Sequence, residues 1–156
     1  MPRPGVSQRR EDVDLVCACA TARRAARAVT QLYDSWLRTR QIEGPQFALL
    51  AMLDRLGECN QTTLSRRFDL DKTTLSRNLK LLKRKGWIES VPGSDARERR
   101  LALTSLGRRR LAAARPAWRR AQAELRSSMS ARDWDAMWKA PRTITRAARR
   151  ARSGPA

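Results

Sequence analysis

The sequence predicts one mainly helical domain of the α+β class, with a single two-stranded hairpin. Its 156 residues suffice for one hydrophobic core. Apolar residues recur at helical spacing over most of the chain, whereas residues 87–103 alternate like a pair of strands. We therefore expect a single domain over 12–150. A helix pair and the hairpin lie within 45–104 of it, between long helical segments at 12–43 and 105–150.

The first two helices are expected ahead of this central region. From about Asp12 to Leu37 apolar side chains recur every three or four residues, opposite an arginine-rich face. Pro45 suits the first turn of a second helix, and Gly57 ends that helix, as glycine commonly does. Residues 1–11 are expected to form a flexible basic arm, because two prolines and a glycine precede any periodicity.

A third and a fourth helix are expected to form the pair that precedes the hairpin. Thr62 is the predicted N-cap of the third helix and Asp71 that of the fourth, since short oxygen-bearing side chains satisfy the first backbone N–H groups. Gly86 closes the fourth helix. Residues 87–91 and 101–103 are the predicted strands. The inner face of the fourth helix consists of Leu75, Leu79 and Leu82.

Two further helices are expected after the hairpin. Thr104 is the predicted N-cap of a long helix, and Pro116 inside it predicts a bend. Ser130 opens a last helix, which Pro141 is expected to interrupt because proline lacks a backbone N–H group. Residues 151–156 are expected to be a disordered tail.

The composition argues against enzyme chemistry and favours a polyanionic partner. The chain has no histidine, so a Ser-His-Asp or Cys-His pair cannot form, and its three cysteines make no secreted disulfide framework. We expect no enzymatic activity, no metal and no cofactor. The formal net charge of +19 favours nucleic acid or an acidic membrane surface. Because no apolar run approaches the ~20 residues of a membrane span, we expect a cytoplasmic protein without a membrane partner.

The fourth helix presents a polar face opposite its leucines. At about 100° per residue, this arc carries hydrogen-bond donors suited to base edges and phosphates. Arg77 is predicted to read a base, because arginine can meet guanine O6 and N7 together. Thr73, Ser76 and Asn78 are expected near the groove floor, and the basic residues around them on phosphates. The full predicted set is Lys72, Thr73, Thr74, Ser76, Arg77, Asn78, Lys80, Lys83 and Arg84.

The tip of the hairpin is the second predicted DNA contact. Asp95 and Arg97 share one face of an extended strand, and their pairing would shape the loop so that Arg97 points into a minor groove. Arg99 and Arg100 are expected on flanking phosphates. Glu98 among three arginines argues against a purely nonspecific basic segment. A helix for the major groove beside a hairpin for the minor groove predicts double-stranded DNA as the partner.

These residues resemble the multiple-antibiotic-resistance regulator (MarR) family of winged-helix transcription factors over roughly 12–150. The resemblance implies a winged helix-turn-helix lobe at 45–104 and dimerisation helices at 12–43 and 105–150. It implies a homodimeric repressor on a pseudo-palindromic operator. The helix-turn-helix match runs from Leu64 to Trp87. The strongest match is Asp95-x-Arg97-x-x-x-Leu101-x-Leu103-Thr104-x-x-Gly107.

The resemblance also implies a signal that releases the DNA. Family members commonly bind a small aromatic acid or phenolic compound between the dimer helices and the DNA lobe. The residues that could line such a pocket, or simply form core, are Tyr33, Trp36, Phe47 and Trp118. The spacing of Cys19 to Tyr33 resembles the peroxide-sensing branch, although Gly44 stands where that branch has a second tyrosine. A redox switch at Cys19 and a buried structural cysteine are both open. Cys17 lies about 200° from Cys19 on a helix, which disfavours a two-cysteine chelate.

A second function fits the same charge. A nonspecific architectural nucleic-acid-binding protein would need only the +19 balance. Its binding should collapse uniformly as salt rises, because counterion release is the main driving term. A regulator should instead keep a preference of about 10³-fold or more for its operator.

Overall fold

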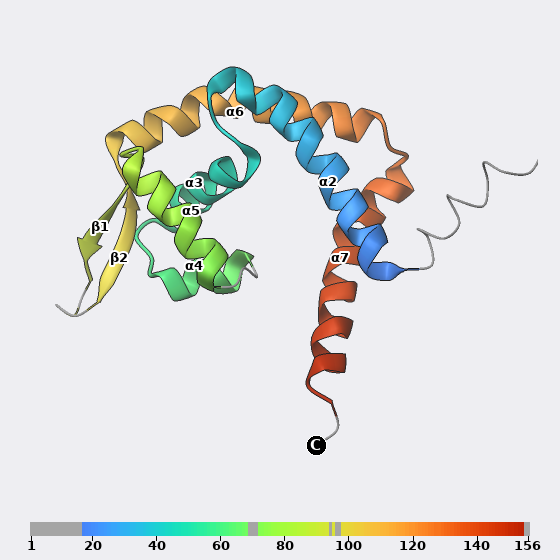
Figure 1. Cartoon of the computed structure of the whole chain (residues 1–156). Coiled ribbons are helices and arrows are strands. Elements are labelled where there is room, and N and C mark those ends of the chain that lie inside the picture. Colours follow the sequence, from blue (N-terminus) through green and yellow to red (C-terminus); the bar gives the residue numbers. More distant parts are fainter. Residues whose placement is uncertain (1–16, 69–71, 94, 96–97, 155–156) are drawn as a thin grey trace, which may run out of the picture. The chain divides into compact units, whose positions relative to one another are not determined.

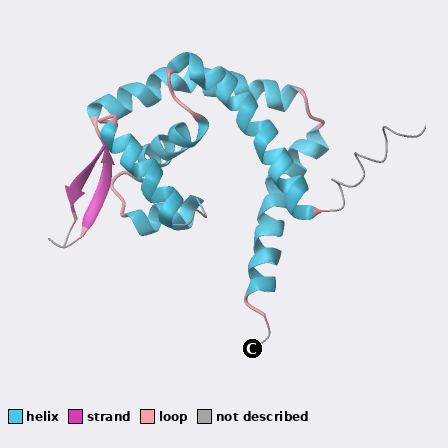
Figure 2. Ribbon diagram, viewed as in Figure 1, coloured by secondary structure: helices cyan, strands magenta, loops and turns pink. Residues whose placement is uncertain are grey.

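The computed structural model describes most of the chain, which is mainly helical with one two-stranded sheet (Figure 2), as the sequence predicts. The described residues are 17–68, 72–93, 95 and 98–154. The predicted basic arm, the predicted cap Asp71 and the predicted minor-groove residue Arg97 lie outside them. The chain divides into two compact units, Met1–Trp118 and Arg119–Ala156.

The first unit contains most of the secondary-structure elements (Figure 1). In chain order these are α2 (Ala18–Leu37), the 3-10 helix η1 (Arg38–Arg40), α3 (Gly44–Leu56), α4 (Gln61–Phe68), α5 (Lys72–Arg84), β1 (Ile88–Pro92) and β2 (Arg99–Leu103). Helix α6 (Ser105–Ser127) begins in this unit and ends in the second, which also holds α7 (Ala131–Arg152). The division therefore falls inside α6.

One hydrophobic core organises the first unit. Figure 1 shows α3, α4 and α5 gathered beside the hairpin, and their inward side chains are mostly leucines. The fully buried large side chains are Leu37, Ile42, Leu49, Leu50, Leu53, Leu64, Leu75, Leu82 and Leu111. Burying each such side chain contributes roughly 1.5–3 kcal/mol before the cost of ordering the chain. The leucine face predicted for the fourth helix is confirmed, since Leu75, Leu79 and Leu82 are all buried.

The two strands are antiparallel, and the residue before the helix pair forms a bridge with β2. Ile88 pairs with Leu103, and Ser90 pairs with Leu101. Cys59, which precedes α4, forms an isolated bridge with Leu101 through two backbone hydrogen bonds of 3.2 and 2.8 Å. This bridge attaches the start of the helix pair directly to the hairpin.

The helix caps agree with the sequence in most places and differ at α4. The predicted cap Thr62 is wrong: the cap is Asn60, two residues earlier, whose Oδ1 accepts hydrogen bonds from Thr63 N at 2.9 Å and Thr63 Oγ1 at 3.0 Å. Asn is as good an N-cap as Thr, so two candidates two residues apart cannot be ranked locally. Helix α3 also carries a capping box between Glu43 and Gln46 that the sequence reading missed.

The start of α6 is packed against the chain between α5 and β1. Thr104 caps α6 as predicted, because its Oγ1 accepts from Gly107 N at 3.0 Å. The same hydroxyl donates to the Gly86 carbonyl at 2.6 Å, and Thr104 N donates to the Trp87 carbonyl at 3.1 Å. Gly107 is required by this packing: a Cβ there would lie 1.9 Å from the Trp87 carbonyl oxygen.

Replacing Gly107 by Ala should therefore destabilise the protein, by about 3 kcal/mol, the upper range for overpacking a tight contact. The sign is informative because Gly→Ala inside a helix otherwise stabilises by roughly 0.5–1 kcal/mol. Urea unfolding monitored by circular dichroism measures the change, and Ala112→Gly on the exposed side of α6 is the control for helix propensity. A Gly107→Ala protein as stable as wild type would contradict the close approach.

The second unit contains the end of α6 and all of α7. Ser130 caps α7 as predicted, accepting from Asp133 N at 3.1 Å. The prediction that Pro141 interrupts the last helix is wrong, because α7 continues through it to Arg152. One missing N–H removes a single backbone hydrogen bond, and the remaining bonds of a long helix hold the turn together. The helix also runs two residues into the tail expected at 151–156. Among the described residues, no helix combines the length and apolarity needed to cross a bilayer.

Candidate nucleic-acid interface

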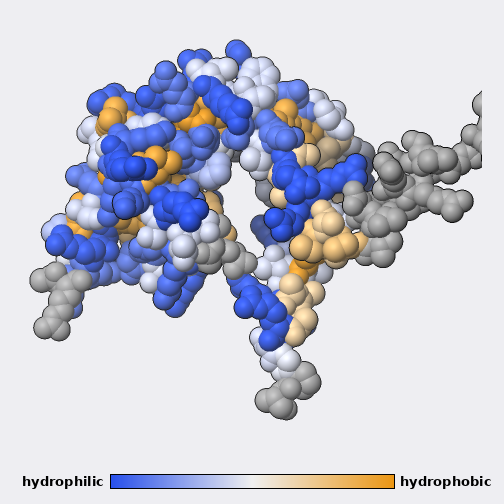
Figure 3. All heavy atoms as spheres, viewed as in Figure 1, coloured by the Kyte–Doolittle hydropathy of each residue, from blue (hydrophilic) through white to orange (hydrophobic). Residues whose placement is uncertain are grey.

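Helix α5 carries the polar surface that the sequence predicts. Its buried leucines face the core, and the opposite side is exposed to solvent. The exposed members of the predicted set are Lys72, Thr73, Thr74, Ser76, Arg77, Lys80, Lys83 and Arg84. Asn78 is half-buried, at the edge of the leucine face. Figure 3 shows hydrophilic side chains covering most of the visible face of α4 and α5.

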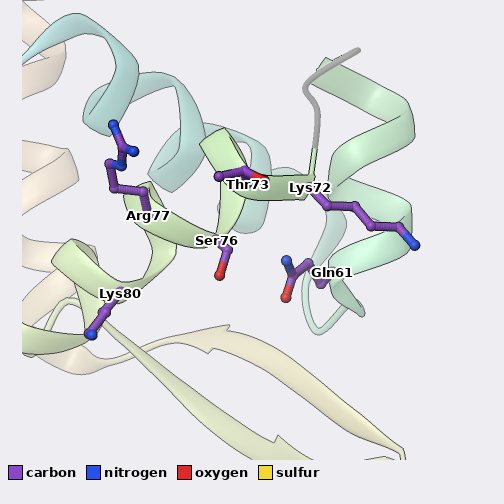
Figure 4. A pocket seen from close by; sticks show the side chains of 6 residues that line it. All are labelled: Gln61, Lys72, Thr73, Ser76, Arg77 and Lys80. Atoms are coloured by element: carbon purple, nitrogen blue, oxygen red, sulfur yellow. The ribbon is translucent and has the colours of Figure 1, made fainter.

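A hollow of about 470 Å³ opens beside this surface. It is lined by Gln61, Lys72, Thr73, Ser76, Arg77 and Lys80 (Figure 4). Gln61 is the first residue of α4, and its side-chain amide points toward the same gap as the Ser76 hydroxyl. The amide group can donate and accept, which suits a base edge or a phosphate. Sequence reasoning missed Gln61, because the residue enters the site only once α4 begins after Asn60.

Lys83 has a partner within the protein. Its Nζ donates to Ser90 Oγ on β1 at 2.6 Å, which connects α5 to the hairpin. An ammonium group has three donors, so this bond leaves capacity for a phosphate. Lys85 follows the helix and lies 4.5 Å from the ring centroid of Trp87, which Arg110 approaches at 5.4 Å. These cation–π contacts hold the end of α5 against α6.

The hairpin brings together the other predicted DNA contacts that lie within the described chain. Arg99 and Asp95 are exposed. Arg100 is half-buried and pairs with Glu98, its Nη2 lying 3.4 Å from Glu98 Oε2. Glu98 Oε1 in turn accepts from Asn60 Nδ2 at 3.1 Å. Arg100 therefore supports the base of the hairpin, whereas Arg99 is directed to solvent.

The four aromatic residues predicted for an effector pocket pack on the core of the first unit. Phe47 and Trp118 stack with ring centroids 5.8 Å apart and an interplanar angle of 18°. Tyr33 and Trp36 are half-buried against the same core. Burial raises the pKa of the Tyr33 phenol above its ordinary value, so Tyr33 is a neutral hydrogen-bonding group at neutral pH. Phe47 and Trp118 are therefore in direct contact, and Tyr33 and Trp36 share with them the packing on this core.

The cysteines occupy two environments. Cys17 is the N-cap of α2 with an extended backbone, φ −98° and ψ 108°, so the 200° separation expected from a continuous helix does not apply. Cys17 and Cys19 are both exposed, and the option of a buried structural Cys19 is wrong for the single chain. Cys59 is buried. Desolvation raises the pKa of the Cys59 thiol, and the nearby Arg100 charge partly offsets the rise.

The fold and this surface define a winged-helix DNA-binding protein: a two-helix unit with an exposed polar recognition helix, followed by a basic two-stranded wing. Within the described residues, no group of three or more potential ligands is placed to hold a metal ion.

Comparison with known proteins gives the family. Residues 40–99 match the sequence profile of the MarR family. The transcriptional regulator MosR of M. tuberculosis, solved in complex with DNA, is 38% identical; the match covers 87% of this chain and 98% of that one, with a TM-score of 0.78. The chain therefore belongs to the MarR family of transcriptional regulators, whose members are not enzymes.

Two more distant structures share the fold. The PcaV regulator of Streptomyces coelicolor, in complex with its natural ligand, is 24% identical over 84% of this chain and 93% of that one, with a TM-score of 0.74. The oxidised form of MarR from E. coli is 18% identical over 83% and 94%, with a TM-score of 0.66. No curated protein sequence matched the chain.

Proposed function

We propose that this chain is a homodimeric, sequence-specific repressor that binds a pseudo-palindromic operator. The observation that carries the proposal is the exposed polar side of α5, which faces away from a leucine core and lies beside a basic hairpin. Arg77 reads a base in the major groove, with Thr73 and Ser76 beside it, because such side chains match base edges. Lys72, Lys80 and Arg84 neutralise phosphates and set the register. Gln61 joins this surface from α4.

The wing supplies the second contact in this proposal. Arg97 enters the adjacent minor groove, where the narrow groove focuses negative potential. Arg99, which is exposed on β2, holds a flanking phosphate, and Asp95 shapes the loop. The related MosR was solved with DNA, which supports duplex DNA as the partner of this chain.

We propose dimerisation because large apolar side chains of α2 and α7 are exposed in the single chain. Leu37 is the only buried residue of α2, and Val29 on the same helix is 36% exposed. In the second unit, α7 has no buried residue, and Trp138 and Ile144 are 48% and 54% exposed. Exposed large apolar side chains on long helices are typical of surfaces that pair with another chain. A two-fold dimer fits half-sites about one helical turn apart, ~10 base pairs.

The operator itself is the first test. The purified protein should enrich one palindromic sequence from a random duplex library at near-physiological salt, with half-sites about 10 base pairs apart. Tight binding without any enrichment would instead support the nonspecific architectural function, for which the charge of +19 is sufficient.

Release by a small aromatic or phenolic effector is proposed for the region of Tyr33, Trp36, Phe47 and Trp118. A structural relative, PcaV, was solved with its natural ligand, which supports a ligand-responsive mechanism in this fold. Binding of aromatic acids to the dimer, followed by loss of operator binding, tests this part of the proposal.

Release by oxidation is the alternative signal, at Cys19. This thiol is exposed near the start of α2, and the MarR protein of E. coli was solved in an oxidised form. If Cys19 is the switch, Cys19→Ser should abolish peroxide-induced release of the operator, whereas Cys59→Ser, at a buried thiol, should leave release intact. Gel-shift titration with and without peroxide measures both. Unchanged release in Cys19→Ser would remove the redox switch from the proposal.

A further inference from the structure

We propose that Asn60 and Glu98 are positioning residues: their hydrogen bond fixes the hairpin to the N-terminus of α4, so that wing and helix pair meet DNA in a fixed relation. The inference rests on the DNA-binding function proposed above. Neither residue belongs to the recognition set predicted from the sequence, and they lie 38 positions apart in the chain.

The Asn60 side chain bonds both to the N-terminus of α4 and to the hairpin. Its Oδ1 accepts from Thr63 N at 2.9 Å and Thr63 Oγ1 at 3.0 Å, which caps α4. Its Nδ2 donates to Glu98 Oε1 at 3.1 Å. Because the amide is planar, the cap that orients the oxygen also sets the direction of the N–H donors. The helix terminus therefore aims a donor at the wing.

Glu98 is equally fixed within the hairpin. Its backbone N donates to the Asp95 carbonyl and its carbonyl accepts from Gly93 N, both at 2.9 Å. Its second carboxylate oxygen accepts from Nε and Nη2 of Arg100 at 3.4 Å. The side chain also packs directly on Gly93, where a Cβ would lie 2.7 Å from Glu98 Oε2. The carboxylate thus joins both strands at the base of the tip to α4.

Neighbouring bonds reinforce the same attachment. Cys59, next to Asn60, exchanges two backbone hydrogen bonds with Leu101 on β2. On the other strand, Ser90 accepts from Lys83 of α5 at 2.6 Å. Each strand is therefore connected to one helix of the pair, and the Asn60–Glu98 bond is the connection nearest the tip.

The negative charge of Glu98 makes the two possible roles of this residue predict opposite changes in DNA affinity. A carboxylate that is 29% exposed on a DNA-binding surface repels phosphates, so its removal should tighten DNA binding if charge were its only effect. A positioning role predicts the opposite, because a wing without this bond is held less firmly near its tip and must be ordered during binding.

The test places the hydrogen-bond acceptor at position 60 and the donor at position 98, the reverse of the wild-type protein. Asn60→Asp keeps the cap of α4, since Asp and Asn cap equally well, but sets a second carboxylate against Glu98. We expect the affinity for the duplex enriched by the wild-type protein to fall about tenfold, the scale of a lost charge-assisted hydrogen bond. Adding Glu98→Gln supplies a new donor toward position 60 and restores the net charge. This double variant should recover to within about threefold of wild type.

The matched control separates position from charge. Asn60→Asp combined with Glu89→Gln has the same net charge, but Glu89 is exposed on β1, so the connection at Asn60 stays broken. This variant should remain weak. Equal recovery of the two double variants would show that charge alone matters and would overturn the inference.

A DNA-free readout makes the result independent of the proposed function. Protection of the amides at positions 93 and 98 against hydrogen exchange in the free protein should fall in Asn60→Asp and in Glu98→Ala, and return to the wild-type level with the reversed pair. Unchanged exchange in both broken variants would overturn the positioning role. If the wild-type protein enriches no duplex, the proposed function fails, whereas the exchange rates still decide whether this bond positions the wing.

Discussion

A Trp138→Glu variant is expected to be monomeric and to bind the operator at least about 100-fold more weakly. Trp138 is 48% exposed on α7 and packs edge-to-face on Trp134, with ring centroids 5.6 Å apart. A carboxylate placed in an apolar dimer interface is left without a partner, which is among the most costly changes at an interface. The loss in DNA binding follows because two linked half-site contacts exceed the affinity of one by 10²–10⁴-fold.

The control for this variant lies on the same helix. Thr143→Glu introduces the same carboxylate on the charged side of α7, beside Lys139 and Arg150 at about 100° per residue, and should remain dimeric. Light scattering coupled to size exclusion gives the oligomeric state, and circular dichroism shows whether α7 is retained. Ile144→Glu, at a side chain 54% exposed, should repeat the effect without removing the Trp134 contact. Dimeric Trp138→Glu and Ile144→Glu proteins would exclude this face of α7 from the interface.

Arg77→Ala is expected to weaken operator binding by about 10- to 100-fold and to relax the preference at one base position of each half-site. A bidentate contact to guanine is worth roughly 1–3 kcal/mol of discrimination, and 1.4 kcal/mol is tenfold. Arg77 is exposed, so its guanidinium group is accessible to a base edge, and the residue is one of those that line the hollow beside α5. Sequencing of duplexes selected by the variant and by wild type measures both effects.

Arg84→Gln is the matched control, because it removes one positive charge from the same exposed side of α5. This variant should weaken all duplexes alike and lower the salt slope by about one, as expected for a lost phosphate contact. Arg84 suits this purpose better than Lys83, whose ammonium group also donates to Ser90. Identical selection profiles for the two variants would show that Arg77 does not read a base.

The basic residues of this surface differ in whether they are bonded within the protein or exposed. Arg100 is occupied at the base of the wing by Glu98, and Lys83 is bonded to β1. Arg77 and Arg84 extend from the exposed side of α5. Arg100 and Lys83 are thus bonded within the protein. We propose that the exposed Arg77 and Arg84 contact the duplex.

The sequence by itself determined most secondary-structure elements and the polar surface of α5, which we propose as the recognition helix. Hydrophobic periodicity is a local property, so the leucine face of α5 and the alternation of the two strands could be recognised within short windows. The caps Thr104 and Ser130 and the helix end at Gly86 were also predicted correctly, because each depends on neighbouring residues. The family motif around the wing added the fold that these elements form.

The tertiary structure decided what depends on contacts between distant residues. Asn60, rather than Thr62, caps α4, and Gln61 therefore lines the hollow beside α5. The close approach that makes Gly107 necessary and the Asn60–Glu98 bond both join segments 20 or more positions apart, which no local pattern encodes. Pro141 inside α7 shows the same principle in one helix: proline removes one hydrogen bond, and whether a helix ends there depends on all the others.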